Sequence, residues 1–354
     1  MPYRFQFRRY RLPFRAPVRT AHGLWSERQG VLVRMEDEAG LAGYGEAAPI
    51  PHFGGEAVDE IEAACRAVGE WPDDRTVDAV PVELGCLRHA IATARAGLGG
   101  SPSRAAAQHK AIGVAALLPA GRAALSLVGP KAEIGYRVFK WKVGVADVAE
   151  EISLLDDLCA VLPAGARLRL DANGAWERRQ AERWLERCAE RPVEFIEQPA
   201  FAKASEGGSA RRKTDELLLG LANDYPTPLA LDESVAGDGD VERWIGLGWP
   251  GIFVMKTGLH GDVAGTLARL AKAKAPVVFS SALETAVGAR AALRIAFAWS
   301  EGAKSAPTVP PRALGFGVWP LFVDARVEGP TALPYLRAED VERIDVEAAW
   351  NALS

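Results

Sequence analysis

The chain has 354 residues, of which 49% are apolar and 25% are charged, and its formal net charge at pH 7 is −4. This composition is typical of a folded globular protein and excludes a disordered chain. The near balance of charge gives no electrostatic reason to expect a nucleic acid or an anionic membrane surface as a partner. No stretch approaches 18 uncharged apolar residues, which argues against a membrane span.

The cysteines and the N-terminus indicate the compartment. Cys65, Cys86, Cys159 and Cys188 show no CxxC spacing, so a disulfide framework or a zinc site is not expected. No continuous apolar stretch follows the N-terminal charges, as a secretory signal would require. We therefore expect a cytoplasmic protein.

The first part of the chain predicts an antiparallel sheet followed by helices. Residues alternate with period two in Tyr3–Arg11 and Gly30–Glu36, with turns expected at Asp37–Gly40 and Gly43–Gly45. Stretches rich in Ala, Glu, Leu and Arg then predict helices over 55–70 and 82–97. This order of elements favours an α+β unit.

From about Ala111 onward, short apolar runs alternate with amphipathic helical stretches. The runs are Ile112–Leu118, Tyr136–Val143, Leu168–Asp171, Val193–Glu197, Leu229–Asp232, Ile252–Lys256 and Val277–Ser281. Apolar strands that alternate with helices indicate a parallel sheet covered on both faces, and about seven such units predict an α/β fold of the TIM-barrel type. Periodicity alone leaves a doubly wound open sheet as an alternative. The Gly/Ser-rich, charged stretch Lys203–Lys213 is interpreted as an inserted surface loop.

Most of these strands end on an ionisable side chain. The residues concerned are Lys140, Lys142, Asp171, Glu197, Asp232 and Lys256. Charges at the ends of apolar strands cost several kcal/mol unless they are paired or bound to a metal. In a barrel the carboxyl ends of the strands converge on one face, which is where active sites of this architecture lie.

The three carboxylates come from three consecutive strands and form a set of oxygen ligands. Such a set favours Mg²⁺, with Mn²⁺ as a substitute, and the absence of accompanying histidine or cysteine argues against zinc.

The lysines complete the chemistry. Lys140 and Lys142 are two residues apart on a strand, so both side chains face the barrel interior. Their mutual repulsion is expected to lower the pKa of one of them, which would then act as a base on a carbon acid. Lys256 would approach from another side. The net positive charge of the lysines, carboxylates and metal favours a small anionic substrate and an enediolate formed from it.

The order KxK, Asp, Glu, Asp, Lys resembles the muconate-lactonizing-enzyme subgroup of the enolase superfamily. Within it the chain is most similar to the o-succinylbenzoate synthase family, through the stretches Gly45–Pro51, Leu170–Trp176, Phe195–Pro199 and Ser280–Thr285. The implied fold is an α+β capping domain over residues 1–105 and a (β/α)7β barrel over residues 106–324. Its last short strand would fall near Leu314–Val323, and the segment from about 325 to 354 is expected to pack back onto the cap.

The resemblance also implies roles for residues. Asp171, Glu197 and Asp232 would bind Mg²⁺, and Lys142 would take the proton beside the substrate carboxylate. A lysine base and an Mg²⁺-stabilised enediolate are established features of this superfamily. Lys140 would tune Lys142, and Lys256 would face the opposite side of the ring as a cation. Other residues would orient ligands (Asn173 and Glu233) or contact substrate (Ser280, Ser281, Arg19 and His22). The last two belong to Arg19–Trp25, which is expected to be a polar loop between strands of the cap.

The implied activity is Mg²⁺-dependent dehydration of 2-succinyl-6-hydroxy-2,4-cyclohexadiene-1-carboxylate in menaquinone biosynthesis. A racemase of N-succinyl or other N-acyl amino acids, or another muconate-lactonizing-type enzyme, is the alternative because it would use the same charged positions. A Schiff-base aldolase using one of the lysines and a noncatalytic binding barrel are further alternatives. The chain shows no His–Asp dyad and no Asp-x-Asp near Leu314–Pro320, which disfavours mandelate racemase-type and dipeptide-epimerase activities. The oligomeric state stays open.

Overall fold

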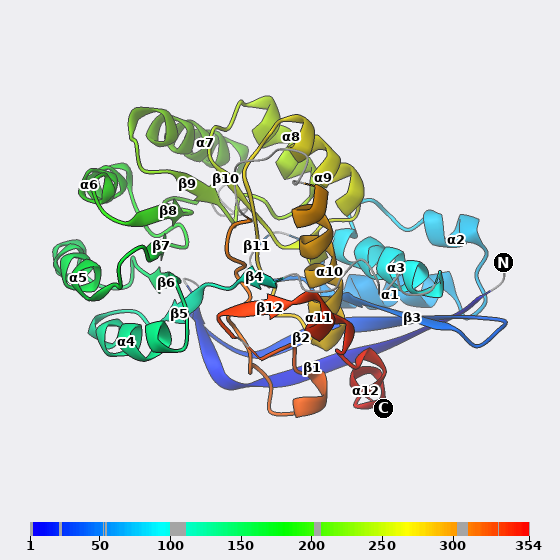
Figure 1. Ribbon diagram of the computed structural model, residues 1–354. Helices are drawn as coiled ribbons and strands as arrows, with labels where there is room; N and C mark the ends of the chain where they lie inside the picture. Colours follow the sequence, from blue (N-terminus) through cyan, green and yellow to red (C-terminus); the bar gives the residue numbers. More distant parts are fainter. Residues whose placement is uncertain are drawn as a thin grey trace.

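The computed structural model describes residues 3–20, 23–51, 53, 55–99, 111–201, 207–302, 311–331 and 333–353. The chain begins with an antiparallel sheet in the order β1–β2–β3, formed by β1 (Tyr3–Thr20), β2 (Gly23–Asp37) and β3 (Ala42–Ala47). One face of this sheet shares a hydrophobic core with α1 (Val58–Val68), α2 (Asp74–Asp78) and α3 (Gly85–Leu98). We call this α+β unit the cap; its long β1–β2 ribbon runs below the barrel in the view of Figure 1.

The turn expected at Gly43–Gly45 is wrong, because these residues lie within β3. The two glycines serve close packing instead. A Cβ atom on Gly43 would lie 1.8 Å from the carbonyl oxygen of Ala94, and one on Gly45 would lie 1.9 Å from that of Ala90, both in α3. Glycine therefore lets helix α3 approach the strand backbone more closely than any side chain would permit.

The second unit is a parallel barrel whose strands follow one another in chain order from β5 to β11. The strands are β5 (Ala116–Leu118), β6 (Val138–Lys142), β7 (Arg167–Asp171), β8 (Val193–Glu197), β9 (Leu229–Leu231), β10 (Ile252–Met255) and β11 (Val277–Phe279). Leu314 and Gly315 close the ring by bridging Val114 on one side and Ser280 on the other. The closing segment thus lies within the range expected for the last strand, and the α/β barrel fold is confirmed.

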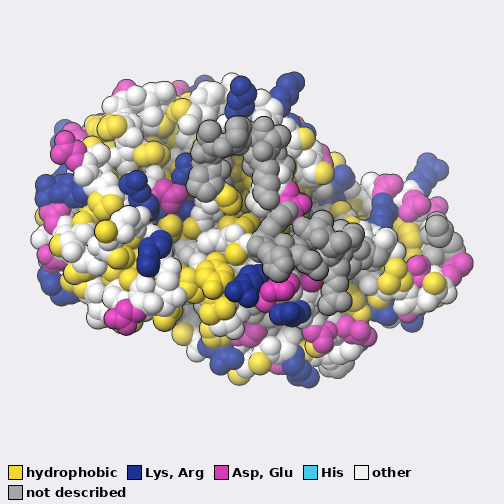
Figure 2. Space-filling model, in the orientation of Figure 1, with side chains coloured by type: hydrophobic (Ala, Val, Ile, Leu, Met, Phe, Trp, Pro, Cys, Tyr) yellow, Lys and Arg dark blue, Asp and Glu magenta, His cyan; other side chains and the backbone are white. Residues whose placement is uncertain are grey.

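Helices separate the strands and cover the outside of the barrel (Figure 1). They are α4 (Leu125–Glu133), α5 (Val148–Val161), α6 (Arg178–Cys188), α7 (Gly207–Asp224), α8 (Asp238–Gly246), α9 (Val263–Lys272) and α10 (Ala286–Gly302), with short 3-10 turns η1 (Arg122–Ala124), η3 (Thr257–Leu259) and η5 (Ala325–Val327). No helix in the described ranges is long and apolar enough to span a bilayer. Figure 2 shows basic and acidic side chains interspersed over the visible face, in keeping with the near balance of charge.

The end of the chain returns to the cap. β12 (Tyr335–Arg337) pairs with β4 (Ala111–Gly113), so the apolar run Ile112–Leu118, expected as one strand, is divided between β4 and β5. After α11 (Ala338–Glu342), helix α12 (Val346–Asn351) places Trp350 against the cap sheet. The guanidinium of Arg8 lies 4.3 Å from the centroid of the Trp350 ring and donates a hydrogen bond to the Trp350 carbonyl.

Two expectations concern segments that the structure describes only in part. The boundary between residues 105 and 106 lies outside the described residues. Of the loop expected over Lys203–Lys213, residues 203–206 also lie outside them, whereas residues 207–213 form the first part of helix α7. The loop prediction is wrong there because the helix gains tertiary support, including an ion pair between Arg211 and Asp240 at the start of α8.

Candidate active site

The strand pairing brings three of the predicted site residues into one row. Lys142 at the end of β6 is the register partner of Asp171 at the end of β7, and Asp171 is the partner of Glu197 at the end of β8. Asp232 follows β9 directly, and Lys256 follows β10. The parallel strands therefore place these side chains around the carboxyl end of the barrel.

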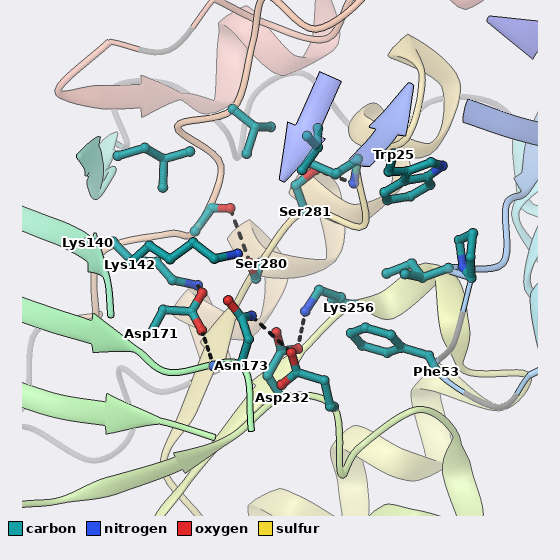
Figure 3. A pocket seen from close by; sticks show the side chains of 18 of the residues that line it. Trp25, Phe53, Lys140, Lys142, Asp171, Asn173, Asp232, Lys256, Ser280 and Ser281 are labelled. Carbon is teal, nitrogen blue, oxygen red and sulfur yellow. Dashed lines mark hydrogen bonds and ion pairs between the residues drawn. The ribbon is translucent and has the colours of Figure 1, made fainter. Parts of the chain in front are cut away.

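Alternation along β6 explains why its lysines face inward. Phe139 and Trp141 are fully buried on the opposite side of the strand. The Trp141 ring packs at 6.3 Å from the ring of Trp184 in α6, between the barrel and its outer helices. Lys140 and Lys142 consequently point into the barrel, where both line the same cavity as Asp171 (Figure 3).

The lysines form ion pairs with the carboxylates. The Nζ atom of Lys140 lies 2.9 Å from Oδ2 of Asp171 and 2.7 Å from Oε1 of Glu197. Lys256 forms a short ion pair with Asp232. In this arrangement the described Asp, Glu, His and Cys side chains nowhere gather in threes closely enough to hold a metal ion.

These ion pairs change the electrostatics expected from the sequence. Burial by itself disfavours the charged form of Lys140, but the nearby carboxylates Asp171, Glu197 and Asp232 outweigh it and raise the Lys140 pKa. The pKa of Asp171 is lowered, because the pull of Lys140 exceeds the effect of burial. The depression expected for one of the two lysines therefore does not fall on Lys140, where the carboxylates dominate.

An uncharged residue that sequence reasoning missed orients the third carboxylate. Gln198 is fully buried just after β8, and its side-chain oxygen accepts hydrogen bonds from the backbone N–H groups of Asp232 (3.0 Å) and Ser234 (3.1 Å). Its amide nitrogen donates to Oγ of Ser234 (2.8 Å) and to the carbonyl of Ala200 (2.7 Å). Gln198 thus ties the end of β8 to the loop after β9. Its position directly after the strand-end residue Glu197 was the sequence feature that could have identified it.

Asn173 and Glu233 lie beside the carboxylates, and Nδ2 of Asn173 donates to Oε1 of Glu233 at 3.0 Å. The other side-chain oxygens, Oδ1 of Asn173 and Oε2 of Glu233, are buried and accept no hydrogen bond from the described chain. Burial and the neighbouring Asp232 raise the pKa of Glu233 to about 7. In this corner of the cavity, the oxygen acceptors therefore outnumber the hydrogen-bond donors and cations that contact them.

The donor set fits a hard divalent cation. Three carboxylates from adjacent strands, together with the unsatisfied oxygens beside them, offer oxygen ligands only, as Mg²⁺ prefers. Binding such an ion at Asp171, Glu197 and Asp232 requires Lys140 and Lys256 to exchange their present ion pairs with these groups.

The cavity has a volume of about 400 Å³, and the cap forms part of its wall. Apolar cap residues line this side: Val18, Leu24, Trp25, Ile50, Pro51 and Phe53. The Phe53 ring centroid lies 5.1 Å from Nζ of Lys256, a distance at which a ring face attracts a cation (Figure 3). The cap and the barrel together therefore enclose the strand-end charges.

Of the four residues expected to contact substrate, the structure places two serines in the cavity wall. Ser280 and Ser281 line the cavity, but the hydroxyl of Ser280 donates to the Gly315 carbonyl (3.2 Å) and that of Ser281 donates to Glu284 (2.9 Å). Arg19 lies near the end of β1, paired with Leu24, whereas His22 lies outside the described residues. Gly23, Leu24 and Trp25, expected in a loop, belong to β2.

Comparisons with known proteins agree with this architecture. A family model described as "MenC, N-terminal domain" matches residues 3–95, and one described as "Enolase C-terminal domain-like" matches residues 126–331. The o-succinylbenzoate synthase of Thermosynechococcus vestitus is 38% identical over 320 residues, which cover 89% of this chain and 92% of that protein. That of Edwardsiella ictaluri is 30% identical over 306 residues, covering 82% and 85%.

Solved structures give the same result. The o-succinylbenzoate synthase of Thermosynechococcus elongatus, complexed with Mg in its active site, superposes with a TM-score of 0.80 at 35% identity and covers 99% of both chains. An N-succinyl Arg/Lys racemase of Bacillus cereus superposes with a TM-score of 0.79 over 99% and 98% of the two chains, but at 18% identity, so it supports the fold alone. The chain belongs to the o-succinylbenzoate synthase family, and its barrel belongs to the enolase C-terminal domain-like family.

Proposed function

We propose that this protein dehydrates 2-succinyl-6-hydroxy-2,4-cyclohexadiene-1-carboxylate to o-succinylbenzoate with the help of Mg²⁺, as a step of menaquinone biosynthesis. The observation that carries the proposal is the row of Lys142, Asp171 and Glu197 on neighbouring strand ends, in a chain that is 38% identical to an o-succinylbenzoate synthase. A lysine beside a row of carboxylates is suited to removing a proton next to a substrate carboxylate.

Lys142 carries the proton through the reaction. Its neutral amine takes the hydrogen from the ring carbon that bears the carboxylate, and the C–H electron pair moves into the carboxylate as an enediolate. The resulting ammonium then protonates the departing hydroxyl group on the adjacent ring carbon. The C–O bond breaks, water leaves, and the electrons return to complete the aromatic ring. The same nitrogen thus acts first as base and then as acid, so no external proton is consumed.

The other charged residues stabilise the negative charge that develops. Asp171, Glu197 and Asp232 would hold Mg²⁺, which supplies positive charge beside the substrate carboxylate. Lys140 adds a positive charge next to the first two of these carboxylates, where its raised pKa keeps it protonated. Lys256 faces the cavity from the far side of the row, beside the Phe53 ring. Preorganised cations of this kind favour an enediolate over the less charged ground state.

The apolar cap wall is suited to the rest of the substrate. Trp25, Ile50 and Phe53 offer nonpolar surface to a ring and its methylene chain, and they exclude water from the reacting carbon. Ser280, Ser281, Arg19 and His22 are proposed to contact its carboxylates. The four cysteines, all free thiols, support a reducing compartment, and we assign the enzyme to the cytoplasm.

Formation of the aromatic product, followed by ultraviolet absorbance with Mg²⁺, tests the proposal. We expect turnover that EDTA abolishes. Lys142→Ala should reduce kcat by at least about 10²-fold, because it removes the group that transfers the proton. Lys131→Ala is the control, since this lysine lies on the outer helix α4 and should leave kcat unchanged. Absence of turnover by the wild-type protein in the presence of Mg²⁺ would contradict the proposal.

A second candidate is racemisation of N-succinyl or other N-acyl amino acids. It is favoured by one observation: Lys256 lines the same cavity as Lys142 but comes from a strand on another side of the barrel. Two bases on opposite faces of a carbon are what racemisation needs. Exchange of the α-hydrogen of N-succinyl amino acids in deuterated water, observed by NMR, would support this activity, and its absence would exclude it.

A further inference from the structure

Two charged side chains of the cap are buried where the cap meets the barrel. Arg28 of β2 is 0% exposed and Glu46 of β3 is 3% exposed. Burying a charge is costly unless hydrogen bonds replace the lost water, so the partners of such groups show what they hold in place. We call Arg28 and Glu46 the cap–barrel clamp.

Arg28 connects backbone carbonyls of the cap with backbone carbonyls of the barrel. On the cap side its guanidinium donates to Pro49 (2.5 Å) and Ala48. On the barrel side it donates to Leu283 (3.1 Å) and Ala282 (3.2 Å). The cap carbonyls directly precede Ile50 and Pro51, which line the substrate cavity, and Leu283 lines it from the barrel. One planar group therefore joins two neighbouring parts of the cavity wall, one from the cap and one from the barrel.

The same guanidinium also supports a third part of the wall. It lies 5.2 Å from the centroid of the Trp25 ring, which is within the range of a cation–π contact. Trp25 lines the cavity from the end of the ribbon at which β1 ends and β2 begins (Figure 3).

Glu46 also contacts the barrel, but as an acceptor of hydrogen bonds rather than a donor. Its carboxylate accepts hydrogen bonds from the backbone N–H groups of Thr285 (3.0 Å) and Gly288 (2.9 Å), at the start of helix α10. These are unpaired donors at the positive end of the helix dipole, where a carboxylate is stabilising. Tyr10 of the cap donates a further hydrogen bond to Glu46 at 2.5 Å. A Cβ on Gly288 would lie 2.9 Å from Oε2 of Glu46, so glycine permits this close approach.

Both anchor points lie on or next to the segment 280–285, which joins β11 to α10: Arg28 holds its middle, and Glu46 holds its end and the first turn of α10. Within it Leu283 has a φ of 60°, in the left-handed region that a leucine rarely adopts. Its N–H donates to Oγ of Ser281 at 2.9 Å, and its carbonyl accepts from Arg28. A strained segment keeps its conformation only when its surroundings impose it, and here the clamp contacts the strained residue itself and the residues that follow it.

We propose that Arg28 and Glu46 are positioning residues that fix the substrate-binding segment 280–285 against the cap wall of the cavity. Among the described residues, the side-chain hydrogen bonds of the clamp go to Tyr10, Gln29 and residues 48–49 of the cap and to residues 282–288 of the barrel, and to none of the strand-end lysines or carboxylates. Loss of either member should therefore weaken binding of the organic substrate while leaving Mg²⁺ binding intact. This inference rests on the proposed function for its kinetic readout.

The test uses Arg28→Lys, which keeps the charge but loses the planar fork, and Glu46→Gln, which keeps the shape but loses the charge. Arg34→Lys and Glu36→Gln are matched controls, because these two residues of β2 form an ion pair with each other (2.7 Å) inside the cap. Steady-state kinetics with the cyclohexadiene carboxylate, calorimetric titration with Mg²⁺ and thermal unfolding are measured on all four variants.

We expect KM to rise by about tenfold or more in both clamp variants, since small misplacements of positioning groups have large effects. Mg²⁺ affinity should stay within about twofold of the wild-type value, as clamp and metal ligands share no contact. The controls should retain wild-type KM. Hydrogen exchange supplies a readout independent of turnover: amides of residues 280–288 should exchange faster in the clamp variants than in the controls.

The opposite pattern would overturn the inference. If the clamp variants lose thermal stability or active fraction while KM and exchange at 280–288 stay unchanged, the clamp has only a general structural role. If neither variant folds, the clamp is a requirement of folding and the assigned positioning role is likewise rejected. Failure of the proposed function is distinguished by the wild-type protein, which would then form no aromatic product although it binds Mg²⁺.

Discussion

At the scale of single residues, Gln198 shows how an uncharged side chain can fix the backbone beneath a charged one, here the proposed metal ligand Asp232. Its side-chain oxygen accepts hydrogen bonds from the backbone N–H groups of Asp232 and Ser234. These bonds fix the backbone of Asp232 and so limit the directions in which its carboxylate can point. Because Gln198 is fully buried, its removal would leave these two N–H groups without the partner that they have in the folded protein. The geometry of Asp232 therefore depends on a residue that makes no ionic contact itself.

We predict that Gln198→Leu lowers the affinity for Mg²⁺ by about 10–100-fold, the usual effect of removing a group that orients a metal ligand. Isothermal titration with Mg²⁺ measures this affinity. Gln180→Ala serves as the control because the Gln180 side chain only accepts an N–H at the start of helix α6. Equal Mg²⁺ affinity in the Gln198 variant and the wild-type protein would refute the orienting role.

His89 provides a second prediction at this scale. Burial, together with the nearby His260, lowers the pKa of His89 from 6.5 to about 4. The unfolded chain takes up a proton on this imidazole below pH 6.5, whereas the folded chain does not until about pH 4. Stability therefore falls as the pH drops through this window, and at pH 5 the cost is about 2 kcal/mol.

Urea unfolding at pH 7 and pH 5 measures this effect. The loss of unfolding free energy between the two pH values should be about 2 kcal/mol smaller in His89→Gln than in the wild-type protein, because glutamine does not titrate. The comparison isolates His89 from Glu284, whose pKa is raised to about 7 by burial and which contributes the opposite slope in both proteins. An identical pH dependence in variant and wild type would show that His89 does not titrate as described.

At the scale of elements, the contact between helix α3 and strand β3 determines how the cap is built. The carbonyl oxygens of Ala90 and Ala94 lie against the backbone of Gly45 and Gly43, with no side chain between helix and strand. This spacing places Glu46, the next residue of β3, at the barrel surface, where it reaches helix α10. Close packing inside the cap thereby positions one member of the cap–barrel clamp.

Gly45→Ala should destabilise the protein by about 1–3 kcal/mol or more, because the added methyl group forces the helix away from the strand. Chemical unfolding measures the loss. Gly129→Ala in helix α4 is the matched control: its Cβ meets nothing within 4 Å, and alanine is favoured in a helix. The prediction fails if both variants are as stable as the wild-type protein.

At the scale of the whole molecule, the site belongs to neither unit alone. The barrel supplies the lysines and carboxylates, whereas the cap supplies the apolar wall that encloses them. Asp171, Glu197 and Asp232 come from three separate strands, so they are close together only in the folded barrel. An ion that binds all three stabilises the folded state over the unfolded chain.

Mg²⁺ at about 100 times its dissociation constant should raise the unfolding free energy by about 2.7 kcal/mol. Thermal unfolding with Mg²⁺ and with EDTA measures the difference. Asp232→Asn should abolish most of the Mg²⁺-dependent increase. Asp156→Asn, which removes an outer ion pair with Arg187 and Arg191, should retain it. A Mg²⁺ effect of equal size in Asp232→Asn and the wild-type protein would exclude Asp232 as a ligand.

Local patterns in the sequence determined the barrel strands and the charges at their ends. An apolar run that ends in Asp171 or Glu197 is visible in a few neighbouring residues, and parallel strands necessarily bring such ends together. Alternation likewise predicted that Lys140 and Lys142 face inward, because the period of two is a property of the strand itself.

Contacts between residues far apart in the chain were decided only by the tertiary structure. The raised pKa of Lys140 depends on carboxylates from other strands, and the roles of Gly43 and Gly45 depend on a helix some fifty residues away. The buried charges of Arg28 and Glu46 have their barrel partners more than two hundred residues on. A sequence pattern indicates which element a residue belongs to and whether its side chain is buried. The pKa of Lys140, the packing of the two glycines and the partners of the buried charges depend instead on the distant groups that replace water around them.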